Sequence, residues 1–262
     1  MLATILTLGV YWPGEYLQTN PDKSVNWAAV ETSIGDLAAH NVNAVWLTHR
    51  NAADTARFAR IADKYGVKVV ASLYNLDCKE PTVVNNFNAA NTVARIRTEW
   101  GDAPKPLAWG IGDEPYSTGC VSRFQAAFGD EPTTAVLMHN QVALHPNMPW
   151  RTVNVYPFFS EGNPNRYAGR AWAAWINNVR RVPWAMGQSF QEPWGPYTLE
   201  AGNIVYQPGG APHWVYPSPA EMRWQALTAL AVGSKGMFFF AYRWPIFQRR
   251  FRFLRTLVVP KV

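Results

Sequence analysis

The chain has 262 residues, of which 48% are hydrophobic and only 16% charged, so it can bury a large core and is too apolar for a disordered protein. Six of its 24 basic residues follow position 242, where no acidic residue occurs, and the remaining 18 balance the 18 acidic residues. A protein that tracks phosphates needs basic residues spread over its fold, so this distribution argues against a nucleic-acid partner.

The sequence offers no candidate for a membrane-spanning helix. It contains no uncharged apolar stretch of about 18 residues, the length needed to cross a bilayer. Residues 1–10 are apolar, but they have neither a basic region before them nor a small-residue cleavage site, so no signal peptide is visible. We therefore interpret this segment as part of a first strand.

Strand-like runs alternate with helical patterns in the first half of the chain, an order that is typical of parallel βα units. Apolar residues recur at helical spacing from Trp27 to Ala38, from Thr55 to Tyr65 and from Val83 to Ala94. The predicted strands around these helices are residues 7–12, 43–48, 67–73 and a run that ends at Asp113 and Glu114.

The second half continues the alternation less regularly. It predicts strands at residues 135–138, 152–156, 182–190 and 236–242, a helix over 171–179 and a long Pro/Gly/Trp-rich loop over 191–217. Ser218-Pro219-Ala220-Glu221 is a strong helix start, with Ser as the N-cap and Glu three residues later. Too few residues separate the fifth and sixth strands for a full helix.

Eight strands with alternating helices predict an α/β protein with one (β/α)8 barrel domain. The barrel is expected over residues 1–244, irregular around strands five and six and incomplete after strand eight. Residues 245–262 form a basic tail in which Arg and Phe alternate, without the helix that a barrel needs there. A truncated or frame-shifted gene end would explain this tail.

The end of the fourth strand carries the strongest functional signal. An apolar run stops at Asp113 and Glu114, and Pro115 then prevents the strand from continuing. Acidic groups at the mouth of a buried strand are costly unless they face water, a ligand or a partner, and this end of a parallel barrel carries active sites. Glu114 is therefore the leading candidate for a catalytic acid, with Asp113 beside it. The alternative is that Glu114 caps the fourth helix.

The other strands also end in polar and aromatic residues of the kinds that bind sugars. The candidate substrate-binding residues are Trp12, Glu15, Tyr74, Asn75, Asn140, Tyr156, Gln188, Trp194, Tyr242 and Trp244. The 13 Trp residues have a plainer interpretation as core filling. His49 and His139 also follow strands, but the five histidines lack metal-ligand spacing and no phosphate-binding loop is present, so we expect no metal and no cofactor.

The motif Gly112-Asp113-Glu114-Pro115 resembles that of the clan of (β/α)8 retaining glycoside hydrolases. In that clan the general acid/base is a Glu at the end of strand four, often within Asn-Glu-Pro or Asp-Glu-Pro. Residues 217–223 and 231–240 look like the last helix and strand of uncharacterised bacterial members. The resemblance covers residues 5–242 and implies hydrolysis of O-glycosidic bonds in an oligo- or polysaccharide, with Glu114 as the acid/base.

The chain departs from the clan at strand seven, where the nucleophilic Glu is expected. Gln188 occupies this place, and an amide cannot attack an anomeric carbon. Three hypotheses follow. Glu192 could serve as nucleophile or general base, or a carboxylate from another strand could act at the wider separation of an inverting enzyme. The carboxylates considered for that second role are Glu15, Asp77 and Glu161. In the third hypothesis the barrel is catalytically inactive and binds glycan. An interaction protein acting through the basic tail is a further, less favoured class.

Cys78 and Cys120 are the only cysteines. They follow the third and fourth strands, whose neighbouring ends bring the two loops together, so we expect a disulfide rather than two free thiols. A disulfide would fit an exported protein, periplasmic or secreted. The sequence gives no indication of oligomeric state.

Overall fold

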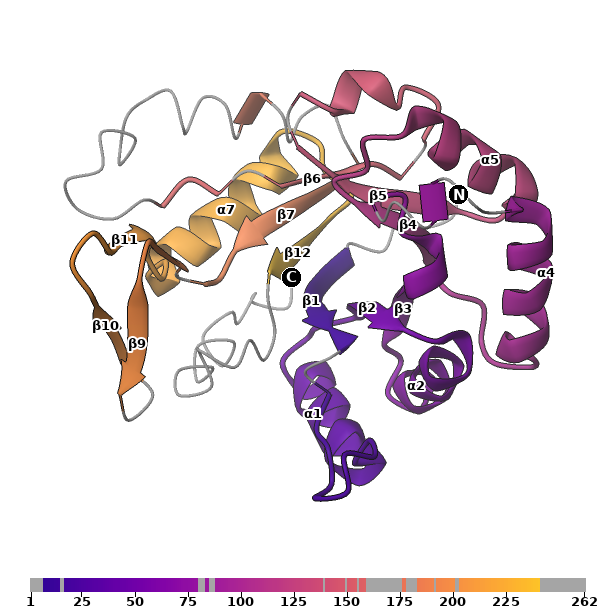
Figure 1. Cartoon of the computed structure of the whole chain (residues 1–262), viewed down its shortest axis with the longest axis horizontal. Helices are drawn as coiled ribbons and strands as arrows, with labels where there is room; N and C mark the ends of the chain where they lie inside the picture. The colour runs from indigo at the N-terminus through magenta and orange to yellow at the C-terminus, as the bar shows by residue number, and fades with distance from the viewer. Residues whose placement is uncertain are drawn as a thin grey trace.

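Eight parallel strands form a closed barrel in the computed structural model (Figure 1), as the alternating sequence pattern predicts. Neighbouring strands are hydrogen-bonded in the order β1-β12-β7-β6-β5-β4-β3-β2. The structure describes residues 7–14, 17–79, 83–84, 88–138, 140–148, 150–154, 156–158, 176–177, 183–190, 192–200 and 203–240. The barrel strands are β1 (Thr7–Pro13), β2 (Ala44–Arg50), β3 (Lys68–Leu73), β4 (Ala108–Asp113), β5 (Thr133–Leu137), β6 (Thr152–Asn154), β7 (Trp184–Gln188) and β12 (Gly236–Phe240).

The helices pack on the outside of this barrel (Figure 1). They are α1 (Trp27–Ala39), α2 (Ala52–Lys64), α4 (Ala89–Trp100), α5 (Thr118–Phe128) and α7 (Pro219–Ala231). Helix α7 lies against β7 and β12, while α2, α4 and α5 pack side by side. The predicted start of α7 is confirmed: Ser218 accepts from the backbone of Glu221, and the Glu221 carboxylate accepts from the backbone of Ser218.

Two apolar layers follow from the alternation of side chains along each strand. Tyr11, Trp46, Trp184 and Phe238 belong to the cluster inside the barrel. Their strand neighbours point outward into a larger cluster, which includes side chains of the surrounding helices. Consecutive residues of a strand therefore have different environments, and this decides which of them can reach a site at the barrel mouth.

The segment after β7 differs from the predicted loop, because it contains two antiparallel ribbons (Figure 1). Strand β8 (Glu192–Trp194) pairs with β11 (Ala211–Trp214), and β9 (Tyr197–Glu200) pairs with β10 (Asn203–Tyr206). The pairing joins residues that are distant in sequence, which local composition does not reveal.

Other parts of the chain agree with the expected irregularity. Among the residues that the structure describes between β5 and β6, a 3-10 turn, η3 (Val142–Leu144), stands in place of a full helix. The predicted helix over 171–179 lies almost entirely outside the described residues, as do the basic tail and the segment after β12. Among the helices that the structure describes, none has the length and apolarity needed to cross a membrane.

Candidate active site

A cavity of about 550 Å³ lies at the carboxyl ends of the barrel strands. One part of its wall carries Asp113, Glu114 and Asn154, from the ends of β4 and β6. The segment after β7 supplies Glu192 and several aromatic rings. The lining residues are Tyr11, Asp113, Glu114, Val136, Asn154, Tyr156, Phe190, Glu192, Pro193, Trp194, Tyr197, Trp214 and Phe240.

A bulge in β4 determines how Asp113 reaches this cavity. Gly110 pairs with Thr134 and Asp113 with Val136, so β4 has one residue more than β5 over this interval. The extra residue reverses the alternation and allows Asp113 to line the cavity. Gly112 has a φ of +147° here, and a β-carbon at this position would lie 3.0 Å from the Pro115 ring, so glycine is required.

Glu114 follows Asp113 directly, yet both side chains line the same cavity. In a regular strand the two would point to opposite faces. Glu114 instead has a left-handed backbone conformation, with a φ of +57°, and its N–H donates to the carbonyl of Val136 at 2.8 Å. The buried amide of Gln141 stabilises the turn, because its Nε2 donates to the carbonyls of Glu114 (3.1 Å) and Pro115 (3.3 Å).

Each carboxylate oxygen of Glu114 has a polar neighbour. The Asn154 Nδ2 donates to Oε1 at 2.7 Å, and the Lys79 Nζ lies 3.5 Å from Oε2. One quarter of the side chain is exposed, so the carboxylate is held in place and open to a ligand. Glu114 does not cap the following helix, since the N-cap of α5 is Ser117.

The Asp113 carboxyl has a strongly altered ionisation. Burial raises its pKa to about 6, the charge of adjacent Glu114 adds to the effect, and Lys79 opposes it. Asp77 and His49 act more weakly, the first raising the pKa and the second lowering it. A carboxyl group with this pKa exchanges its proton near neutral pH, as a general acid or base requires.

Tyr156 lies among the three carboxylates of the cavity. Burial raises the pKa of its hydroxyl above the ordinary value, and the charges of Asp113, Glu114 and Glu192 add to the shift. Partial desolvation also raises the pKa of Glu192, although its side chain reaches the surface. The cavity therefore combines an acid pair at the end of β4 with a further carboxylate on β8.

The segment after β7 presents an aromatic surface to the cavity. Trp194 is 60% exposed, and its ring stacks on His213 with a centroid distance of 3.6 Å and an angle of 6°. The ring of Tyr156 packs edge-on against Phe190 and Trp214. A flat ring fixed by a neighbour and open on one side is suited to packing against an apolar sugar face.

The structure corrects the predicted role of Trp12. This residue is fully buried in the outer cluster, with its ring edge against Phe58 of α2, so it cannot stack on a ligand in the cavity. The preceding residue, Tyr11, lines the cavity instead. The pattern of alternating side chains gives the reason, because only one of two consecutive residues in β1 can face the barrel interior.

Gln188 is also placed differently from the prediction. It is fully buried and does not line the cavity. Its Nε2 donates to the carbonyls of Phe158, Phe190 and Val215, and its Oε1 accepts from the backbone of Phe158. The amide therefore satisfies backbone groups and leaves no donor for a sugar hydroxyl.

The remaining predicted residues fall into two groups. Tyr74, Asn75 and Asn140 are described, and none of them lines the cavity. Tyr74 and Asn75 lie in the 3-10 turn η2 (Tyr74–Leu76), where the Tyr74 ring is 5.7 Å from that of His49. The other predicted residues, Glu15, His139, Glu161, Tyr242 and Trp244, lie outside the described residues.

Sequence reasoning did not find Asn154, Gln141 or Lys79. Asn154 is the last residue of β6 and could have been found by the same strand-end rule that selected Tyr156. The roles of Gln141 and Lys79 depend on loop contacts that leave no sequence pattern. Within the described residues, no group of three or more His, Cys, Asp or Glu side chains is placed to hold a metal ion.

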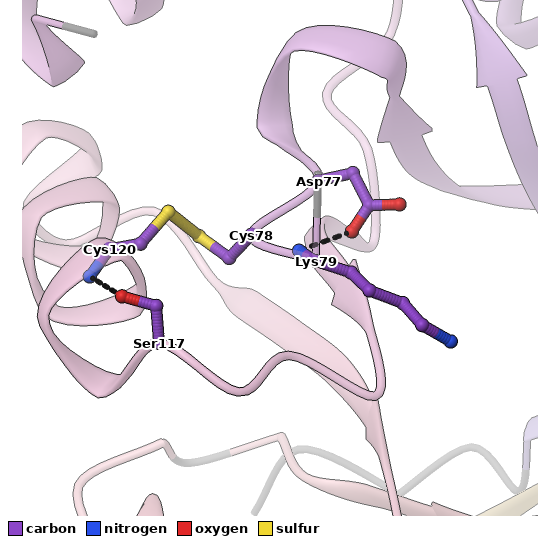
Figure 2. Close-up of a disulfide and its surroundings, with 5 residues drawn as sticks. All are labelled: Asp77, Cys78, Lys79, Ser117 and Cys120. Carbon is purple, nitrogen blue, oxygen red and sulfur yellow. Dashed lines mark hydrogen bonds between the residues drawn. A yellow bond between two sulfur atoms is a disulfide. The ribbon is translucent and has the colours of Figure 1, made fainter. Parts of the chain in front are cut away.

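Cys78 and Cys120 form a disulfide, with their Cα atoms 5.8 Å apart (Figure 2). Both residues are buried. The bond joins the segment after η2 to the first turn of α5, the helix that follows the acid pair.

No protein-family model matches the chain, and no curated protein matches its sequence. Solved structures share its fold. A β-glucuronidase from Ruminococcus gnavus superposes with a TM-score of 0.59 at 14% identity, over 90% of this chain and 43% of that one. An exo-β-1,4-mannosidase from Opitutaceae bacterium strain TAV5 gives 0.56 at 12% identity, over 91% and 52%. A class V chitinase from Nicotiana tobaccum gives 0.52 at 11% identity, over 91% and 96%.

These similarities establish the fold. The chain has the (β/α)8 barrel that these glycoside hydrolases also have, and it spans less than half the length of the glucuronidase.

Proposed function

We propose that the protein is a glycoside hydrolase that cleaves O-glycosidic bonds of an oligo- or polysaccharide, with Glu114 as the general acid/base. One observation carries the proposal: a single cavity at the catalytic end of the barrel contains Asp113, Glu114 and Glu192 together with open aromatic rings. The fold shared with glucuronidase, mannosidase and chitinase structures is consistent with this assignment.

Glu114 would protonate the leaving glycosidic oxygen. Asn154 fixes Oε1 and leaves the other oxygen facing Lys79, so the side chain has one defined orientation in the cavity. Asp113 would bind sugar hydroxyls close to the cleaved bond, and Trp194 would support the sugar ring.

Glu192 would supply the second carboxylate. It lies on the ribbon side of the cavity, whereas Glu114 lies on the β4 side. The charges of both carboxylates raise the pKa of Tyr156, which also lines the cavity. Of the other carboxylates considered, Asp77 is buried and accepts from the backbone of Lys79, and it does not line the cavity.

Glu114→Gln tests the acid/base assignment. The variant keeps the size of the side chain but cannot donate an acidic proton, so we expect a loss of at least about 100-fold in kcat on natural glycans, with glycan affinity retained. Aryl glycosides and plant or algal polysaccharides form the substrate panel. Unchanged turnover would contradict the assignment.

Glu192→Gln and the anomeric configuration of the product identify the second carboxylate. A retained configuration indicates a nucleophile, and an inverted one indicates a base that activates water. Activity that survives Glu192→Gln would exclude Glu192 from either role.

A glycan-binding barrel without catalysis is the alternative. The engagement of Gln188 with backbone carbonyls favours it, because the usual place of the strand-seven nucleophile then has no carboxylate. Calorimetry with intact oligosaccharides distinguishes the two: saturable binding with no cleavage after long incubation supports the binding protein.

A further inference from the structure

The loop after η2 brings Lys79 to the Asp113–Glu114 pair, and a disulfide bond holds this loop. Cys78 stands between Asp77 and Lys79, and its disulfide ties it to Cys120 in α5 (Figure 2). Cys120 in turn donates through its backbone N–H to the Ser117 hydroxyl at 3.2 Å. Helix α5 begins four residues after Glu114. The disulfide bond therefore connects the backbone next to Lys79 to the turn that carries Glu114.

Two further contacts fix the backbone on either side of Cys78. The Cys78 N–H donates to the carbonyl of Ile111 in β4 at 3.4 Å, and the Lys79 N–H donates to Oδ1 of Asp77 at 2.9 Å. Figure 2 shows the Lys79 side chain extending away from the disulfide. Its Nζ lies 3.5 Å from Oε2 of Glu114.

A lysine with 44% of its side chain exposed is not held in place by its ion pair alone. Exposed ion pairs contribute little, and ordering a long side chain costs conformational entropy. A rigid backbone at Lys79 reduces this entropy cost, because only the side-chain rotamers remain to be ordered. The disulfide and the two backbone contacts make the backbone rigid there.

We propose that Lys79 is a positioning residue for the Asp113–Glu114 pair, and that the buried Cys78–Cys120 disulfide holds its ammonium group beside Glu114. The charged groups around Asp113 explain why a fixed cation is needed there. Glu114 and Asp77 are acidic neighbours, and Glu192 shares the cavity with Asp113 and Glu114. His49 is a cation only when protonated, and the hydroxyls of Tyr11 and Tyr156 complete the surroundings. Lys79 thus provides the permanent positive charge acting on Asp113 among these described groups.

The catalytic consequence rests on the proposed hydrolysis, but the electrostatic effect does not. Lys79 lowers the pKa of Asp113, against the effects of burial and of Glu114. Removal of the cation should therefore raise this pKa further, whether or not the protein cleaves glycans.

The test is a carboxyl titration by carbon-13 NMR of the full chain, in wild type, Lys79→Met, Lys79→Arg and Lys64→Met. We expect the pKa of Asp113 to rise by about 0.5 in Lys79→Met and to stay at the wild-type value in Lys79→Arg. Lys64 pairs with Glu31 on the outer surface and serves as the matched control. An unchanged titration in Lys79→Met overturns the proposal.

The disulfide is tested in the same titration with Cys78→Ser/Cys120→Ser, and separately with wild-type protein reduced under native conditions. Both should shift Asp113 in the same direction as Lys79→Met, and a folded protein without that shift overturns the role of the bond. With an active wild type, Lys79→Met should also shift to higher pH the part of the kcat/KM profile that follows the ionisation of Asp113. If no glycan is cleaved, the proposed hydrolysis fails while the titration still decides the role of Lys79.

Discussion

Gln188 and Gln225 bond to one another across the boundary between β7 and α7. The Gln188 N–H donates to Oε1 of Gln225 at 2.7 Å, and the Gln225 Nε2 returns a bond to the Gln188 carbonyl at 3.0 Å. The Gln188 side chain also donates to the carbonyls of Phe158, Phe190 and Val215. This residue therefore joins β7 to α7 and to the segments on either side of the ribbons. The position at which the resemblance to retaining glycoside hydrolases leads one to expect a nucleophile is thus occupied by an amide that stabilises the fold.

Gln188→Glu should destabilise the protein and should not create activity. A carboxylate would face the carbonyl oxygens of Phe158, Phe190 and Val215, to which the amide now donates. We expect the free energy of unfolding to fall by about 3 kcal/mol, measured by urea denaturation. Gln207→Glu, at an exposed position, is the control and should change it by less than about 0.5 kcal/mol. Full stability together with increased turnover would contradict the structural role.

Asp113→Asn should change stability in a pH-dependent way. The folded-state pKa of Asp113 is raised to about 6, so the native protein binds this proton more tightly than the unfolded chain does. The native state therefore loses stability as the pH rises from about 4 to about 6. The variant should lack this loss and gain about 1–3 kcal/mol relative to wild type between pH 4 and pH 7.

Urea denaturation at pH 4, 5.5 and 7 measures this difference. Asp130→Asn is the control, because Asp130 is exposed in the turn between α5 and β5 and does not line the cavity. A constant difference between Asp113→Asn and wild type across this range would show that the carboxyl is not destabilised by its surroundings.

The disulfide should contribute strongly to stability. Cys78 and Cys120 are separated by 42 residues, and closing a loop of this length reduces the entropy of the unfolded chain. We expect Cys78→Ser/Cys120→Ser to lower the free energy of unfolding by about 4 kcal/mol. Ser117→Ala, which removes only the N-cap of α5, should cost about 1 kcal/mol. Equal stability of wild type in oxidising and reducing buffers would argue against the bond.

Trp194→Ala should weaken glycan binding while leaving the fold intact. The ring is largely exposed and contacts the cavity, so its loss removes ligand contacts but little core packing. We expect the dissociation constant for an oligosaccharide to rise about threefold to tenfold by calorimetry. Tyr65→Ala, an exposed aromatic after α2, should leave it unchanged. Equal effects of the two variants would remove Trp194 from the site.

The barrel could be predicted from the sequence because each strand is a short apolar run and each helix has a clear period. Caps such as Asn51 and Ser218 also mark helix starts locally. The ribbons between residues 192 and 214 could not be predicted, since their pairing depends on contacts such as Ala211 with Trp194. A Pro/Gly/Trp-rich composition is typical of a loop and equally compatible with short strands.

The candidate site was only partly predictable. The strand-end rule places Asp113, Glu114 and Tyr156 at one face, and all three line the cavity. It cannot say which of Tyr11 and Trp12 faces inward, because a shift of one residue exchanges the two sides of a strand. The bulge before Asp113 comes from the register of β4 against β5, and the left-handed backbone of Glu114 comes from the contacts of the turn that follows. No residue pattern in the sequence predicts either feature.

One wall of the cavity is formed by barrel strand ends and the other by the ribbons after β7, and these two parts of the chain differ in how far their sequences can vary without loss of the fold. Asp113 and Glu114 stand at the end of barrel strand β4, which pairs with a neighbour on each side. Glu192, Trp194, Tyr197 and Trp214 stand on ribbons in which the two described strands pair with each other. Insertions or exchanges in the ribbons would reshape what the cavity accepts without moving the acid pair. Selection for new ligands, in nature or in the laboratory, can therefore act on one wall while the other stays fixed.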